Sequence, residues 1–169
     1  MTASDRDAVD HHVARWADYW KDHPGFEPAI EGAITRMQTM LSRLKRADAA
    51  AFAGSDFTLE DYKTLHVLMV QPYPTEATPA QLAEAAKVTR AAMTSRLDRL
   101  AEAGLVTRET DDVDRRRVVV RPTKAGEEQW NRYVYEGMDR DKELLGALSP
   151  RELDQLNALL RKVILSFER

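Results

Sequence analysis

The sequence predicts a mainly α-helical protein with one small β-hairpin. Over most of its 169 residues, apolar side chains recur at every third or fourth position, which is the spacing of helices that bury one face. Residues 105–121 break this spacing with two short apolar runs around a strongly charged turn, a pattern typical of a hairpin. We therefore expect helices at both ends of the chain and a compact mixed unit between them.

The most informative stretch is 78–121, TPAQLAEAAKVTRAAMTSRLDRLAEAGLVTRETDDVDRRRVVVR, and it opens with two short helices. Thr78 followed by Pro79 predicts the start of the first helix, because threonine caps a helix well and proline suits its first position. Thr89 is expected to cap the second helix. Its inner face is predicted to consist of Met93, Leu97 and Leu100.

A β-hairpin is predicted directly after the second helix. Gly104 supplies the left-handed stop at the end of that helix, and Leu105 with Val106 begins an extended strand. The second strand is predicted at residues 118–120. Between the strands lies DDVDRRR, a polar tip with three adjacent arginines.

Two helices joined by a tight turn are typical of a helix-turn-helix, which lays its second helix in the major groove of DNA. Small side chains on the outer face permit a close approach to base edges, and a hairpin with an arginine tip fits a wing that reaches the minor groove. The predicted DNA contacts are Thr89, Arg90, Ala91, Thr94, Ser95, Arg96 and Arg99 of the second helix, with Asp114, Arg115 and Arg116 of the tip.

Not every arginine of this unit is expected to contact bases. For Arg96, a structural pairing, a phosphate contact and base reading all remain open. Arg108, Arg117 and Arg121 are expected to be strand-face charges near phosphate or solvent. In the tip, Asp112 or Asp114 could hold one guanidinium in a fixed geometry by a bidentate pair.

The runs VTRAAMTSRLDRLAEAGLVTR and DDVDRRRVVVRPTKAG resemble the winged helix-turn-helix of the MarR family of bacterial transcriptional regulators. The resemblance implies that Thr94 and Ser95 contact bases, that Arg116 enters the minor groove and that Asp114 orients this arginine. It also implies helices at both ends of the chain and a small-molecule effector.

An effector pocket is predicted from side chains of the N-terminal helix and of the helix before the helix-turn-helix. Its candidate residues are Arg15, Trp16, Trp20, His66 and Met69. For the tryptophans themselves, the favoured interpretation is that they belong to the core of a dimer. Lys63 stands where the urate-responsive branch of the family keeps an aspartate, so urate is not supported as the effector.

Further helices are predicted at about 5–22, 27–52, 59–70, 123–148 and from residue 150 onward. We expect residues 1–57 and 123–169 to form a helical dimerisation region, and residues 58–122 to form the winged helix-turn-helix. The last helix carries a broad apolar stripe that one chain has no evident means to cover, which favours a homodimer. Twofold symmetry then implies an inverted-repeat DNA site.

The net charge of −3 argues at first against nucleic acid. Its distribution changes this conclusion, because residues 78–121 hold nine basic and seven acidic residues, whereas the rest of the chain holds 16 basic and 21 acidic ones. A modest basic patch on an acidic body indicates binding to DNA through a defined surface, with a strong dependence on salt.

The composition excludes several other classes of protein. The chain contains no cysteine, which excludes disulfides, thiol catalysis and thiolate metal sites, and its four histidines show no ligand spacing. Since phosphate loops, nucleophile elbows and HExxH are also absent, we expect no enzyme, no metal and no cofactor. No apolar run reaches transmembrane length and the N-terminus does not resemble a signal peptide, so we expect a cytoplasmic protein without a membrane partner.

The sequence therefore predicts a sequence-specific transcriptional regulator, a homodimeric repressor that binds an inverted-repeat operator and is released by a small molecule. The alternative is a dimeric protein-interaction or scaffold protein whose winged helix does not read DNA.

Overall fold

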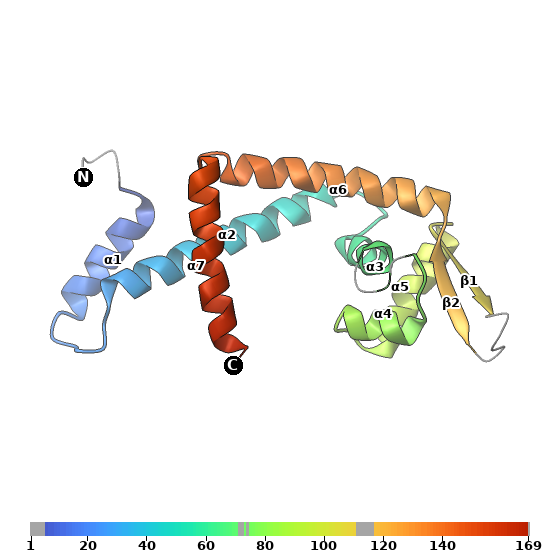
Figure 1. Ribbon diagram of the computed structural model, residues 1–169, viewed down its shortest axis with the longest axis horizontal. Helices are drawn as coiled ribbons and strands as arrows, with labels where there is room; N and C mark the ends of the chain where they lie inside the picture. The colour runs from blue at the N-terminus through green and yellow to red at the C-terminus, as the bar shows by residue number, and fades with distance from the viewer. Residues whose placement is uncertain (1–5, 71–72, 74, 111–116, 169) are drawn as a thin grey trace. The chain divides into compact units, whose positions relative to one another are not determined.

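A computed structural model of the chain describes residues 6–168 apart from 71, 72, 74 and 111–116. It contains two compact units, residues 1–56 and 57–169 (Figure 1). Most of the described residues are helical, and the sheet found among them is a two-stranded antiparallel hairpin. The prediction of a mainly α-helical fold with one small hairpin is confirmed.

The first unit consists of α1 (Ala8–Tyr19) and α2 (Pro28–Ala51). Gly32 of α2 is buried, and a Cβ atom at this position would lie 3.1 Å from Nη1 of Arg36 and 3.6 Å from Cγ2 of Val13 in α1. Val9 of α1 is also buried. Gly32 and Val9 therefore lie at the contact between α1 and α2.

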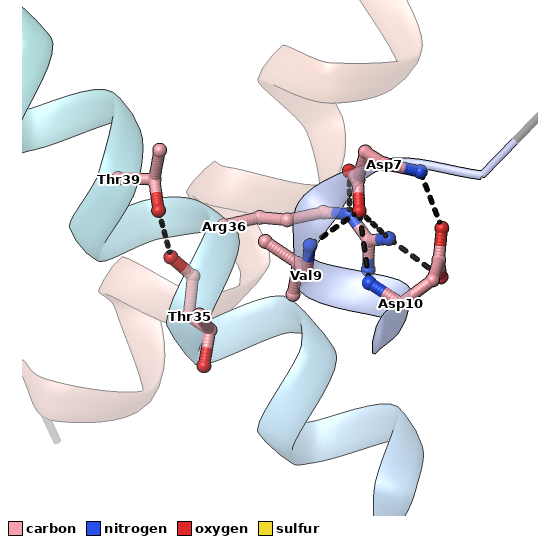
Figure 2. A network of polar contacts seen from close by, with 6 residues as sticks. All are labelled: Asp7, Val9, Asp10, Thr35, Arg36 and Thr39. Atoms are coloured by element: carbon pink, nitrogen blue, oxygen red, sulfur yellow. Dashed lines mark hydrogen bonds and ion pairs between the residues drawn. The ribbon is translucent and has the colours of Figure 1, made fainter. Parts of the chain in front are cut away.

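A polar network fixes the start of α1 to α2 (Figure 2). Asp7 caps α1 by accepting the N–H groups of Val9 and Asp10. Arg36 of α2 donates to both carboxylate oxygens of Asp7, at 2.9 and 3.0 Å, and to Asp10 at 2.9 Å. The Arg36 hydrogen bond, followed by that from the Asp10 backbone, holds the pKa of the Asp7 carboxyl below its ordinary value.

The second unit contains α3 (Leu59–Met69), α4 (Pro79–Ala85), α5 (Arg90–Glu102), α6 (Lys124–Leu145) and α7 (Pro150–Phe167). Each of these helices begins after a hydroxyl side chain that accepts a backbone N–H of the first turn. The five caps are Thr58, Thr78, Thr89, Thr123 and Ser149. Local side-chain chemistry therefore fixes where every helix of this unit starts.

The hairpin consists of β1 (Val106–Thr110) and β2 (Val118–Pro122), paired so that Val106 faces Pro122 and Thr110 faces Val118. Ala77 extends the pairing, because its N–H and C=O groups both bond to the backbone of Val120. The core of the unit lies between the hairpin and α3, α4 and α5. Its most deeply buried side chains are Leu65, Leu68, Leu82, Met93, Leu97, Leu100, Val119 and Val120.

The start of α6 is fitted against the backbone that follows α5. The N–H of Thr123 donates to the Leu105 carbonyl at 3.0 Å, and the Thr123 hydroxyl donates to the Gly104 carbonyl at 2.6 Å. A Cβ atom at Gly126 would collide with the Leu105 carbonyl oxygen. The end of α5 and the start of α6 therefore form one rigid joint, which requires glycine at position 126.

We predict that Gly126→Ala destabilises the protein by about 1–3 kcal/mol, because the new methyl group has no space beside the Leu105 backbone. Gly137→Ala is a matched control in the same helix, since a Cβ atom there would meet only a flexible arginine nitrogen at 3.6 Å. Alanine should stabilise the helix at position 137 by about 0.5–1 kcal/mol. Thermal unfolding followed by circular dichroism measures both; equal shifts for the two variants would contradict the joint.

Candidate nucleic-acid interface

The helix α5 presents one apolar face to the core and one small, polar face outward. Met93, Leu97 and Leu100 are almost fully buried, as the sequence predicts. Arg90, Ala91, Thr94 and Ser95 are exposed. Thr89 caps the helix by accepting the N–H of Ala92 at 3.2 Å, so its predicted place at the start of α5 is confirmed.

A groove runs between the exposed side of α5, the start of α4 and the second strand. From α5 it is lined by Arg90 and Thr94, and from β2 and the residue before it by Val118 and Arg117. The remaining lining residues are Thr78, Pro79 and Ala80. The groove thus combines two arginines and two hydroxyls, with no acidic side chain among these lining residues, and suits a polyanion.

Arg108 of the wing strand β1 forms hydrogen bonds with α5. Its Nη1 donates to the Asp98 carboxylate at 2.8 Å and its Nη2 donates to the backbone carbonyl of Thr94 at 3.2 Å. The Nε atom of Arg108 is buried and has no hydrogen-bond partner among the described residues. The expectation that Arg108 is a strand-face charge near phosphate or solvent is therefore incomplete, because it holds the hairpin against the helix.

On the other side of α5, Arg99 pairs with a carboxylate of α3. Nη2 of Arg99 lies 2.7 Å from Oδ1 of Asp61, whose side chain is only 3% exposed. The same carboxylate accepts the backbone N–H and the hydroxyl of Thr58, which completes a capping box at the start of α3. The predicted DNA contact Arg99 thus already has a partner within the protein.

Comparison with known proteins agrees with this architecture. The model of the MarR family matches residues 55–117. The transcriptional regulator HosA of Escherichia coli is 33% identical over 109 residues, which cover 64% of this chain and 78% of HosA. The chain belongs to the MarR family. The HTH-type transcriptional regulator PecS of Dickeya dadantii is 28% identical over 151 residues, which cover 89% of both chains.

A solved structure of a MarR mutant from Escherichia coli in complex with operator DNA is also similar. It is 27% identical, has a TM-score of 0.60, and covers 76% of this chain and 91% of the MarR chain. The family is one of transcriptional regulators and not of enzymes. This MarR-family chain is accordingly a DNA-binding transcriptional regulator.

Three predicted DNA contacts of this MarR-family wing, Asp114, Arg115 and Arg116, lie outside the described residues, as does Asp112. Of the neighbouring arginines, Arg117 lines the groove, whereas Arg121 pairs with Glu76 at 2.9 Å and with Glu109 at 2.8 Å. The prediction that Arg121 is a strand-face charge is confirmed.

Arg96 lies on the same side of α5 as Arg99, beside a second hollow. Its neighbours there include Tyr62, Lys63 and His66 of α3. His66 Nδ1 is 3.4 Å from the indole nitrogen of Trp130, which α6 contributes. The role of Arg96, whether a structural pairing, a phosphate contact or base reading, remains a prediction.

The predicted effector residues fall into the two units of this MarR-family chain. Arg15 and Trp16 of α1 line one hollow together with Tyr19 and with Trp20, the residue after the end of α1. The two indole rings are parallel within 2°, with centroids 6.1 Å apart. The other candidates, His66 and Met69, lie on α3 in the second unit.

No helix in the described ranges is long and apolar enough to cross a membrane. Within the same ranges, no group of three potential metal ligands occurs.

Two residues of this site, Asp61 and Arg108, were missed as functional candidates from the sequence. A signal for Arg108 was available, because it stands two positions after the buried Val106 and therefore shares the inner face of β1. Asp61 pairs with a residue 38 positions later in the sequence, and such a pairing leaves no local signal.

Proposed function

We propose that the chain is a homodimeric repressor that binds an inverted-repeat operator and is released by a small-molecule effector. In this proposal residues 58–122 read DNA, and residues 1–57 and 123–169 form the dimerisation region. The observation that carries it is the exposed face of α5 beside a groove that contains two arginines.

The DNA-reading face consists of Ala91, Thr94 and Ser95, with Arg90 beside them in the groove. Ala91 offers a methyl group to thymine, and the two hydroxyls can donate to or accept from base edges. Asp98 lies near this face, but its carboxylate is neutralised by Arg108 at 2.8 Å. That pairing supports the proposal, because an unpaired carboxylate would repel the phosphates.

Dimerisation is supported by apolar surface that the single chain leaves uncovered. Helix α7 has no buried residue, although it carries a continuous apolar stripe. Its exposed members include Leu160, Val163, Ile164 and Phe167. Such a contiguous apolar face marks an interaction surface, and a second copy of the chain is the partner that gives the operator its twofold symmetry.

Effector binding is supported by the hollow on α1. Two parallel indoles with an arginine beside them offer apolar surface and one positive charge, which suits a small aromatic acid.

We predict that Thr94→Ala combined with Ser95→Ala weakens binding to a duplex selected from random sequences by about 1–3 kcal/mol for each base-reading group lost. Arg116→Ala should weaken binding to a similar degree, because minor-groove attraction of the guanidinium is lost. Fluorescence anisotropy at fixed salt measures these affinities.

The control for this experiment is Lys142→Ala, which removes an exposed basic residue of α6 paired with Asp139 at 3.1 Å. It should bind the selected duplex as the wild type does. If the α5 and Arg116 variants also bind normally, the assignment of the reading face is wrong. If the wild-type protein selects no duplex at all, the scaffold alternative is favoured.

The dimer is tested with two single substitutions in α7, one at an isoleucine and one at a leucine. The two side chains have similar exposure but lie on different faces of the helix. Ile164 is 54% exposed and lies on the apolar stripe, whereas Leu165 is 49% exposed and lies beyond it. We predict that Ile164→Asp yields a 19.2 kDa monomer in sedimentation equilibrium at micromolar concentration and that Leu165→Asp remains a dimer, as does the wild type. A wild-type monomer, or a monomer of both variants, would contradict the proposed interface.

The effector proposal predicts that a ligand which quenches the fluorescence of Trp16 and Trp20 also releases the selected duplex. Trp16→Ala should abolish the release while leaving DNA affinity in the absence of ligand unchanged. A ligand that releases DNA equally from the wild type and this variant would place the effector elsewhere.

A further inference from the structure

We propose that Arg99 is a positioning residue, which fixes the rotation of α5 by pairing with Asp61 of α3 and does not contact DNA phosphate. The inference rests on the proposed reading of DNA by α5. The sequence suggests that Arg99 contacts DNA. In the present proposal Arg99 instead forms an ion pair within the protein that holds α5 against α3.

The first step is the chemistry of Asp61. Its carboxylate is almost fully buried, and both oxygens are engaged. Oδ2 accepts from the backbone N–H of Thr58 at 3.1 Å and from its hydroxyl at 2.7 Å, while Oδ1 receives Arg99 at 2.7 Å. Among the described interactions Arg99 supplies the cation of this site, and a buried carboxylate without a cation is strongly disfavoured.

The second step is the direction of Arg99 on the helix. Arg90 and Arg99 are nine positions apart, and at about 100° per residue they project from opposite sides of α5. Arg90 lines the groove with Thr94. Arg99 instead reaches α3, where the neighbouring residues Thr64, Leu65 and Leu68 are buried. The two arginines therefore cannot serve the same surface.

The third step is that α5 is held on both sides. Arg108 of β1 donates to Thr94 and Asp98 on the side near the groove, and Asp61 of α3 holds Arg99 on the other. A helix that is held by contacts on one side only can rotate about its axis. Such a rotation would move Thr94 and Ser95 away from base edges, because hydrogen bonds to bases tolerate only a few tenths of an ångström.

The experiment compares Arg99→Met with Arg90→Met, which removes the same charge from the same helix. For each protein we measure the melting temperature, and then the salt dependence of binding to the selected duplex and to an unrelated duplex, well below the melting temperature. Arg90→Met should reduce the slope of log affinity against log salt by about 0.9 per phosphate contact and leave the melting temperature unchanged.

Arg99→Met should leave that slope unchanged, lower the melting temperature by about 5 °C, and reduce the preference for the selected duplex about tenfold. A reduced slope with an unchanged melting temperature would show a phosphate contact and overturn the proposal. A lower melting temperature with unchanged preference would show a merely structural pair and also overturn it.

A double-mutant cycle with Asp61→Asn tests the pair itself. Removing the buried charge should recover part of the stability lost in Arg99→Met, so the double variant should melt at a higher temperature than Arg99→Met alone. Additive losses would overturn the pairing. The cycle is measured by melting temperature and needs no DNA. If the wild-type protein binds no duplex, the proposed function is refuted, but the coupling of Arg99 and Asp61 can still be measured.

Discussion

The close approach of α6 to the backbone of Gly104 and Leu105 is the constraint on which the arrangement of the second unit depends. Thr123 caps α6 and at the same time donates its hydroxyl to the carbonyl of Gly104, two residues after the end of α5. Gly126 leaves the space that this contact needs. One short segment therefore fixes the end of α5, the entry of β1 and the start of α6, and the position of α5 cannot change without moving α6.

The function of each arginine in this chain depends on its partner more than on its charge. Arg36, Arg99 and Arg108 each bond to a carboxylate of another element, and each thereby joins two elements. Arg90 lines an open groove without an acidic neighbour among the lining residues. A net charge of −3 is thus compatible with DNA binding, because several arginines neutralise acids within the protein and a few remain directed at one surface.

The local features of the fold were predictable from the sequence, whereas its long-range pairings were not. Thr78 and Thr89 cap helices as predicted, because a cap depends only on residues within the next turn. The partner of Arg99 depends on which helix packs beside α5, and a single sequence carries no signal for that choice. The predicted helix at 5–22 is shorter in the structure, Ala8–Tyr19, because Asp7 caps its start and the last apolar residue of its pattern, Trp20, is its C-cap. The DNA contacts themselves remain a prediction.

Both α5 and α7 carry apolar residues at helical spacing, but the two apolar faces differ in burial, and this difference connects the fold with the proposed regulation. The apolar face of α5 is buried within its own unit, whereas that of α7 is exposed. In the proposed dimer, α7 would pack against the second copy of the chain, and α6 would link that interface to the joint at Gly126.

A helix of 22 residues, the length of α6, is about 33 Å long, so a rotation of about 5° at one end displaces the other end by about 3 Å. That displacement exceeds the tolerance of a hydrogen bond to a base. If a small molecule releases DNA as proposed, it therefore does not need to touch α5, because a small change in the direction of α6 would suffice.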